Sequence, residues 1–182
     1  SSASFSANEN QTSIGSISAS DADGDSLQYL IISNSEINIS SSGVLTFASA
    51  PDYETKNSYT ATVTVADGKI SVNQFITVNI SNLNDNNPVI SSSATFSAAE
   101  NQTAIGSISA SDADGDSLTY SISGSEINIS SSGVLTFISA PDYETKNSYT
   151  ATVTVSDGAN STTQNITVSI TDVDEAAPNS AP

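Results

Sequence analysis

The sequence contains two copies of one unit. The string SDADGDSL at residues 20–27 returns unchanged at residues 111–118, and the string PDYETKNSYTATVTV also occurs twice. In a tandem repeat each copy is one structural unit that mainly contacts its neighbours in the chain. The repeat therefore predicts two domains, one at residues 1–87 that includes the linker and one at residues 88–182 that includes the start of a next linker.

Each copy has the residue pattern of β-strands. In YTATVTV, Tyr59, Ala61 and Val63 fall on one face of an extended chain, and the threonines between them fall on the other. The same alternation places Tyr120 and Val168 on inward faces. A disordered, low-complexity spacer is the competing interpretation of so much Ser, Thr and Asn, but it does not explain this alternation. In the first copy we expect strands near residues 3–6, 13–19, 27–33, 37–39, 43–47, 58–66 and 70–80.

Seven short strands joined by loops of Gly, Ser, Asn and Asp are typical of a Greek-key β-sandwich. No helical periodicity competes with this pattern. The expected fold class is all-β, with two tandem seven-stranded Greek-key β-sandwiches arranged end to end.

The composition excludes several classes of function. The chain has 20 acidic and 3 basic residues and a net charge of -17, which argues against nucleic acid or an anionic membrane as a partner. It has no His and no Cys, so zinc ligands, thiolate nucleophiles, His-dependent triads and disulfides are all missing. Enzymatic activity is not expected. No apolar run approaches the roughly 20 residues that span a bilayer, and no signal peptide is recognisable, as expected for an excerpt of a longer protein.

The acidic residues are concentrated in short motifs that occur in both copies. Only Glu36 and Glu126 lie outside these motifs. A chain that needed charge only for solubility would distribute it over its strand faces. The motif acids are Glu9 and Glu100, then Asp21, Asp23, Asp25, Asp112, Asp114 and Asp116, then Asp52, Glu54, Asp142 and Glu144, then Asp67 and Asp157, and finally Asp85, Asp172, Asp174 and Glu175.

Such clusters of carboxylates predict a bound cation. Two carboxylates about 4 Å apart repel each other by about 4 kcal/mol at an effective dielectric constant near 20, and three lysines cannot balance the charge. Oxygen ligands without His or Cys select Ca²⁺, whereas Mg²⁺ prefers few protein ligands and retained water. An EF-hand that began at Asp21 would need Gly and Glu where the chain has Ser26 and Ile32. Simple turn chemistry stays open as an alternative, because Asp, Pro and Gly favour turns without any metal.

The order of these motifs resembles that of the cadherin repeat. Both copies carry Glu-Asn near the start, then DAD, then DYE in place of the family's Asp-Arg-Glu, then DG. The first copy ends with NLNDNNP, which is similar to the family's Asp-x-Asn-Asp-Asn-x-Pro. The short DADGDSL loop and the TDVDEAAP ending look most like bacterial cadherin-like tandem repeats of large calcium-dependent surface adhesins. The resemblance covers almost the whole chain and implies a cadherin, immunoglobulin-like sandwich.

In cadherins calcium ions lie between consecutive repeats, and the resemblance implies the same arrangement here. The NDNNP string would then be a linker made of oxygen ligands. The implied ligands at the junction are Glu9, Asp52, Glu54, Leu83 through its carbonyl, Asn84, Asp85, Asn86, Asp112, Asp114, Asp116 and Asp157. The implied half-sites toward further repeats are Asp21, Asp23, Asp25 and Asp67 on one side, and Glu100, Asp142, Glu144, Asp174 and Glu175 on the other.

These observations lead to one functional hypothesis and one alternative. The hypothesis is that the chain forms calcium-rigidified extender repeats of a secreted or cell-surface adhesin that mediates calcium-dependent cell adhesion. Its partners would be neighbouring repeats of the same chain, and its location the outside of a bacterial cell. The alternative is a carbohydrate-binding or homophilic-binding module, whose partner would be a surface glycan or identical repeats. Aromatic residues make up only 6% of the chain, which is few for sugar stacking.

Overall fold

The structure is a computed structural model in which residues 2–33 and 36–175 are described. The described residues up to Leu83 form one compact unit, here called the first repeat, and those from Asn84 onward form a second repeat. Residue 1 and residues 176–182, which belong to the two predicted domains, lie outside the described residues.

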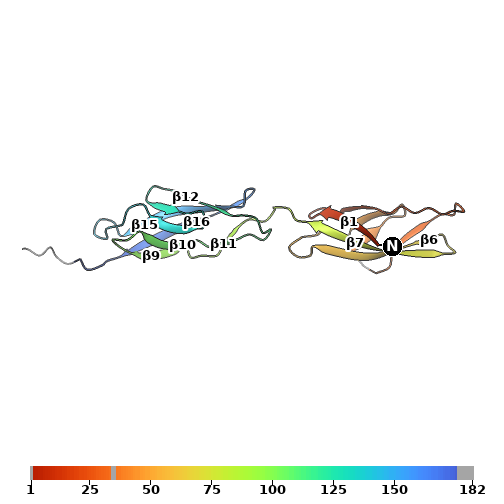
Figure 1. The fold of residues 1–182 in the computed structure, drawn as a ribbon, viewed down its shortest axis with the longest axis horizontal. Coiled ribbons are helices and arrows are strands. Elements are labelled where there is room, and N and C mark those ends of the chain that lie inside the picture. The colour runs from red at the N-terminus through yellow and green to blue at the C-terminus, as the bar shows by residue number, and fades with distance from the viewer. Residues whose placement is uncertain (1, 34–35, 176–182) are drawn as a thin grey trace, which may run out of the picture. The chain divides into compact units, whose positions relative to one another are not determined.

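The first repeat is built from two sheets. Its strands are β1 (Ser2–Asn8), β2 (Ser13–Ser16), β3 (Gln28–Ile31), β4 (Ile37–Ile39), β5 (Val44–Phe47), β6 (Ser58–Ala66) and β7 (Ser71–Ser81). One sheet has the strand order β1-β7-β6-β3 and the other the order β2-β5-β4. β1 and β7 come from opposite ends of the repeat, lie side by side and run parallel (Figure 1). Parallel strands place the residues that follow them at the same end of a sheet.

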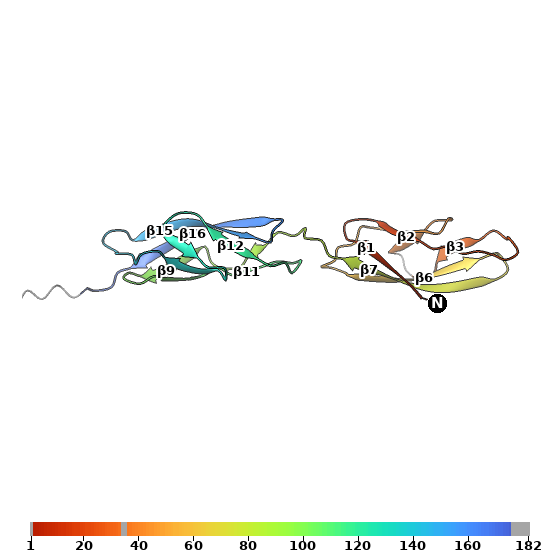
Figure 2. The ribbon, with the colours of Figure 1, turned by 45° about the horizontal axis from the view of Figure 1, so that its top comes forward.

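The second repeat has the same two sheets and one additional strand pair. Its strands are β8 (Val89–Ile90), β9 (Thr95–Ala99), β10 (Ala104–Ser107), β11 (Ala110–Ser111), β12 (Thr119–Ile122), β13 (Ile127–Ile129), β14 (Val134–Phe137), β15 (Ser148–Ser156) and β16 (Ser161–Thr171). The sheets have the orders β12-β15-β16-β9 and β10-β14-β13 (Figure 2). The additional pair, which the sequence did not predict, joins β8 to β11.

Each repeat has its own apolar core, and the predicted all-β sandwich is confirmed. Leu45 and Val63 in the first repeat, and Leu135 and Val153 in the second, are completely buried. The inward alternation predicted for YTATVTV and for Val168 is also confirmed, because these apolar residues are buried or pack against the cores. Each fully buried Val or Leu side chain stabilises the fold by roughly 1.5–3 kcal/mol relative to leaving it exposed.

The predicted strand at residues 13–19 is shorter in the structure, because β2 ends at Ser16. The residues that follow β2 contact the turn before β5 instead, where the amide of Ile17 donates to the carbonyl of Gly43 at 2.8 Å. Gly43 has a φ of 83°, and a Cβ atom at this position would lie 2.3 Å from the carbonyl oxygen of Ile17. The sheet and the turn can therefore approach each other only because this residue is glycine.

Candidate metal centres

A buried glutamate joins three segments at one end of the first repeat. Glu9 follows β1 and is 2% exposed. Its carboxylate oxygens accept hydrogen bonds of 2.8 Å from the backbone amides of Tyr53 and Leu83. Hydrogen bonds to an ionised acceptor are stronger than neutral ones. Glu9 thus fixes the PDYE loop and the residues after β7 against the end of β1.

The second repeat repeats this arrangement. Glu100 is 3% exposed and accepts hydrogen bonds from the amides of Tyr143 at 2.9 Å and Val173 at 2.8 Å. The asparagine of the Glu-Asn motif is favoured at its position for a separate structural reason. Asn10 and Asn101 have φ angles of 61° and 62°, in the left-handed region that asparagine tolerates better than most residues. The motif therefore combines a turn with a buried acceptor.

Further carboxylates gather around both glutamates. Carboxylate oxygens of Glu9 and Glu54 lie within 4.8 Å of each other in the first repeat, and those of Glu100, Glu144 and Asp172 do so in the second. A backbone hydrogen bond lowers the pKa of Glu144, but burial and the negative charges of Glu100 and Asp172 outweigh it and raise the pKa above its usual value. This cluster has the excess negative charge that a cation would relieve.

The last acids of the chain differ in part from the prediction. Asp172, which the cluster includes, was not among the predicted ligands, and in the first repeat its place is taken by Asn82. Glu175 accepts a hydrogen bond of 2.7 Å from the side chain of Asn101. Asp174 does not take part in a carboxylate cluster of the described residues. That Asp174 and Glu175 are ligands stays a prediction.

At the opposite end of the second repeat, the DADGD loop is arranged around Asp112. Its Oδ1 accepts hydrogen bonds from the amides of Asp114 at 3.0 Å and Asp116 at 3.4 Å. Carboxylate oxygens of these three residues lie within 4.8 Å of one another. The Oδ2 atom of Asp112 is buried and has no hydrogen-bond donor. One oxygen of Asp112 therefore shapes the loop, and the other is left for a ligand.

Asp157 of the DG motif is arranged in the same way. Its Oδ1 accepts hydrogen bonds from the amides of Ala159 at 2.7 Å and Asn160 at 2.6 Å, while its Oδ2 is buried without a donor. Burial raises the pKa of Asp157, but the hydrogen bonds from the backbone amides of Asn160 and Ala159 outweigh this effect, so the net pKa lies below its usual value. The residue is held as a carboxylate.

The NDNNP linker bonds to these acidic loops of the second repeat. The amides of Asp85 and Asn86 donate to Oδ2 of Asp114 at 3.1 and 2.9 Å. Asn160 donates from its side chain to Oδ1 of Asn84 at 3.1 Å and to the carbonyl of Asn86 at 3.3 Å. The sequence did not predict a role for Asn160, because the first repeat has Ile70 at the equivalent position and the predicted ligands all came from motifs.

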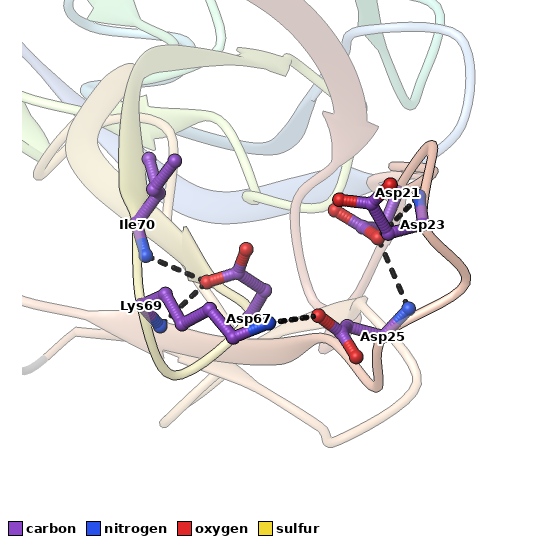
Figure 3. A network of polar contacts seen from close by, with 6 residues as sticks. All are labelled: Asp21, Asp23, Asp25, Asp67, Lys69 and Ile70. Atoms are coloured by element: carbon purple, nitrogen blue, oxygen red, sulfur yellow. Dashed lines mark hydrogen bonds and ion pairs between the residues drawn. The ribbon is translucent and has the colours of Figure 1, made fainter.

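The acidic loop of the first repeat is drawn in Figure 3. Oδ1 of Asp21 accepts hydrogen bonds from the amides of Asp23 at 2.9 Å and Asp25 at 3.0 Å. Amides two and three residues further on donate to Oδ1 of Asp67 at 2.7 and 2.6 Å, and these bonds lower its pKa. The ammonium group of Lys69 pairs with Asp25 at 2.9 Å. In this loop a lysine supplies part of the positive charge.

Asp52 and Asp142 belong to the predicted ligands but are used differently in the structure. The oxygens of Asp52 accept hydrogen bonds from the amide of Thr55 at 3.1 Å and from its hydroxyl at 3.0 Å. Asp142 is bonded to Thr145 in the same manner, and the hydroxyl and amide of Thr145 lower its pKa. Neither belongs to a carboxylate cluster of the described residues. Their assignment as ligands stays a prediction.

The two acids outside the motifs are neutralised by lysines. Lys56 pairs with Glu36 at 2.6 Å, and Lys146 pairs with Glu126 at 2.6 Å. With Lys69 bound to Asp25, every lysine of the chain has a carboxylate partner. The clusters around Glu9, Glu100 and Asp112 therefore receive no lysine among the described residues.

The donor chemistry fits calcium. A buried carboxylate oxygen without a donor is costly, since burying a charge requires a partner. A divalent cation would supply that partner at Oδ2 of Asp112 and of Asp157. All available ligand atoms are carboxylate, amide or carbonyl oxygens, which are the hard ligands that Ca²⁺ takes.

Comparison with known proteins identifies the family. A family model described as a bacterial Ig domain matches residues 1–80 and again residues 84–171. The chain belongs to the bacterial Ig domain family. The two bacterial Ig domains correspond to the two repeats of the structure.

Two relatives resemble these bacterial Ig domains in sequence. Human Protocadherin Fat 4 is 32% identical over 145 residues, which are 70% of this chain and 3% of that protein. Chitinase A of Pseudoalteromonas piscicida is 32% identical over 154 residues, which are 82% of this chain and 19% of that enzyme. The chain thus spans a small part of each relative, and the likeness to the chitinase is a partial match.

The fold of the bacterial Ig domains is that of cadherin repeats. The crystal structure of mouse Cadherin-23 EC22-24 has a TM-score of 0.83 at 21% identity, over 93% of this chain and 63% of that one. The predicted resemblance to cadherin-like tandem repeats is therefore confirmed, and the chain is a pair of modules with this all-β sandwich fold. Within the described part of the chain, no helix is long and apolar enough to cross a membrane.

Proposed function

We propose that the two bacterial Ig domains are calcium-rigidified extender modules of an extracellular bacterial adhesin. Cadherin-like and bacterial Ig domains are extracellular domains, and this chain carries the acid motifs of the calcium-dependent members. Calcium-dependent adhesion and a location on the bacterial surface are the specific parts of the proposal.

One observation carries the calcium assignment. Two carboxylate oxygens, Oδ2 of Asp112 and Oδ2 of Asp157, are buried without a donor in neighbouring acidic loops of the second domain. The first oxygen of each residue is already used for backbone hydrogen bonds that hold its loop. Turn chemistry alone accounts for the bonded oxygens. It does not account for the buried oxygens that have no donor, whereas a bound cation does.

The continuity of the chain supports sharing of calcium by the two domains. Leu83, whose amide bonds to Glu9, is followed directly by Asn84, whose side chain donates to the carbonyl of Asp157 at 3.5 Å. The acids at the end of the first domain and those at the start of the second are therefore attached to one short linker. We infer that Glu9, Glu54, Asp85, Asp112, Asp114 and Asp157 hold Ca²⁺ together, with Asp116 and Asn84 beside them.

The proposed mechanical effect follows from charge. Without a cation, carboxylates attached to one linker repel one another, and the linker is free to bend. Ca²⁺ compensates this charge and binds oxygens from both domains at once, which restricts their relative motion. Repetition of this unit along an adhesin would give a stiff spacer that carries a distal binding domain away from the cell surface.

Calcium titration by isothermal calorimetry tests the proposal on the 182-residue chain. We expect binding in the range of about 10⁻⁴–10⁻³ M or tighter, since extracellular calcium modules bind in this range. At 100 times the dissociation constant each site should add about 2.7 kcal/mol to the free energy of unfolding. Asp112→Asn should weaken binding at least about tenfold. Glu126→Gln is the matched control, because Glu126 is paired with Lys146, and it should bind as the parent chain does.

Solution scattering gives the mechanical readout. The radius of gyration should become larger and its distribution narrower in calcium than in chelator, as expected for restricted relative motion. If the unfolding curves and the scattering are the same with calcium and with chelator, the proposal is wrong.

A further inference from the structure

The turn that contains the DG motif has the same backbone hydrogen bonds in both repeats. In the first repeat the amide of Ile70 donates to Oδ1 of Asp67 at 2.6 Å, and the carbonyl of Ile70 accepts from the amide of Asp67 at 3.2 Å (Figure 3). Asn160 makes the equivalent two bonds with Asp157, at 2.6 and 3.3 Å. Isoleucine therefore satisfies this turn as well as asparagine does, and the turn does not require the side-chain amide of Asn160.

The side-chain amide of Asn160 bonds instead to the linker. Asn160 lies in the loop between β15 and β16, far along the chain from the NDNNP string. The amino group of an asparagine has two N–H donors. Here one bond runs to Oδ1 of Asn84 at 3.1 Å and the other to the carbonyl of Asn86 at 3.3 Å. The two donors thus hold two oxygens of one short segment at the DG loop.

A second loop of the same repeat holds the donors of this segment. Oδ2 of Asp114 accepts from the amides of Asp85 and Asn86, and Oδ1 of Asp114 accepts from the side chain of Asn86 at 2.9 Å. A carboxylate can only accept hydrogen bonds, so Asp114 cannot serve the oxygens of the linker. Asn160 supplies donors to those oxygens. Residues 84–86 are therefore attached to the second repeat from two sides without any metal ion.

The oxygens that Asn160 holds are candidate calcium ligands. Asn84 and Asn86 were both predicted as ligands from the sequence, and amide and carbonyl oxygens are ligands that Ca²⁺ takes. A carbonyl oxygen has two lone pairs, so a hydrogen bond from Asn160 leaves one for a cation. The backbone amide of Asn160 bonds to Oδ1 of Asp157, whose Oδ2 is buried without a donor. Asn160 thus connects the linker oxygens to an acid that has a free oxygen.

We propose that Asn160 is a positioning residue, which holds the oxygens of Asn84 and Asn86 at the acidic loops of the second repeat before calcium binds. Ligands that are ordered in advance reduce the entropy cost of binding. The role toward calcium rests on the proposed function, whereas the attachment of the linker does not. The attachment concerns residues 84–86 and the second repeat alone, so without calcium the two repeats still move relative to each other.

Nuclear magnetic resonance relaxation of the 182-residue chain in chelator tests the attachment. Backbone order parameters are about 0.85 in rigid segments and below about 0.6 in flexible ones. Residues 84–86 should give about 0.85 in the parent chain and less than about 0.6 in Asn160→Ala, which removes both donors. Asn160→Ile should have the same effect, and it should fold because the first repeat has isoleucine in the same turn. Circular dichroism checks the fold of both variants.

Thr163→Asn is the matched control. It also introduces the residue of the first repeat, but Thr163 is exposed on β16 and pairs with Thr154. Its order parameters should equal those of the parent chain. Equal order parameters in the parent chain and in Asn160→Ala would overturn the proposal. An effect of Asn160→Ile without one of Asn160→Ala would also overturn it, since bulk and not the loss of donors would then be the cause.

Calcium calorimetry on the same chains tests the positioning. Loss of a residue that orients a metal ligand typically weakens metal binding about 10–100-fold. Both Asn160 variants should therefore bind calcium at least about tenfold more weakly than the parent chain, and Thr163→Asn should bind as the parent does. A parent chain that binds calcium with the same affinity as its Asn160 variants would refute the positioning role alone. A parent chain that binds no calcium would refute the proposed function and the positioning role with it.

Discussion

Replacement of Glu9 by alanine should destabilise the first domain in calcium-free buffer. The substitution removes the acceptor of two hydrogen bonds of 2.8 Å, from the amides of Tyr53 and Leu83. An unpaired buried donor costs about 1–3 kcal/mol. Both amide-bearing residues stay partly accessible to water, so the lower end applies to each amide. We therefore expect a loss of about 2 kcal/mol in the free energy of unfolding.

Urea unfolding followed by circular dichroism in chelator measures this loss. Glu100→Ala removes the equivalent carboxylate of the second domain and should cost a similar amount there, because its two bonds have nearly the same lengths. Glu36→Ala is the control for loss of a charge without loss of a buried acceptor. Its partner Lys56 is exposed, and such ion pairs contribute about 0–1 kcal/mol.

The same urea unfolding experiments in calcium test whether Glu9 is also a ligand. If Glu9 is also a ligand, Glu9→Ala should cost more in calcium than in chelator, whereas the cost of Glu36→Ala should be the same in both. A loss for Glu9→Ala no greater than that for Glu36→Ala in chelator would refute the argument that a buried carboxylate holds this end of the domain. Equal losses in calcium and in chelator would remove Glu9 from the ligand set.

Two further predictions concern pH and a turn. Because the pKa of Glu144 is raised in the folded protein, its contribution to stability is present below its unfolded pKa and is lost as the pH rises through its folded pKa. In calcium-free buffer Glu144→Gln should therefore stabilise the protein at pH 7 and have little effect near pH 4. The same difference in urea midpoint between the variant and the parent chain at both pH values would disprove this. Gly43→Ala should destabilise the first domain more than Gly24→Ala. Both glycines have φ near 80°, and this left-handed conformation costs about 1–2 kcal/mol for either alanine. Only the Cβ at residue 43 would also lie against the carbonyl oxygen of Ile17. Equal thermal midpoints for the two glycine variants would show that the clash is absorbed.

Much of the candidate site could be predicted from the sequence, because its residues lie in short motifs at fixed spacing. The DADGD and DG strings place their acids in loops whatever the details of packing, and the structure brings Asp112, Asp114 and Asp116 together as adjacent positions in one loop. What the motifs could not show is how each carboxylate is used. Asp52 is bonded on both oxygens by Thr55, whereas Asp112 keeps one oxygen without a donor. Both are aspartates of a recurring motif, and only the surrounding donors distinguish them.

The sequence by itself determined the two-domain organisation, most of the strand positions and the acidic loops, because each depends on local alternation, on turn residues or on repetition. The tertiary structure alone decided which backbone edge is paired. The sequence ISAS at residues 108–111 has no clear strand pattern of its own, yet Ala110 and Ser111 form a strand because Val89 and Ile90 lie beside them. Strand pairing requires hydrogen-bonding groups from another part of the chain, so local alternation could not show this pair.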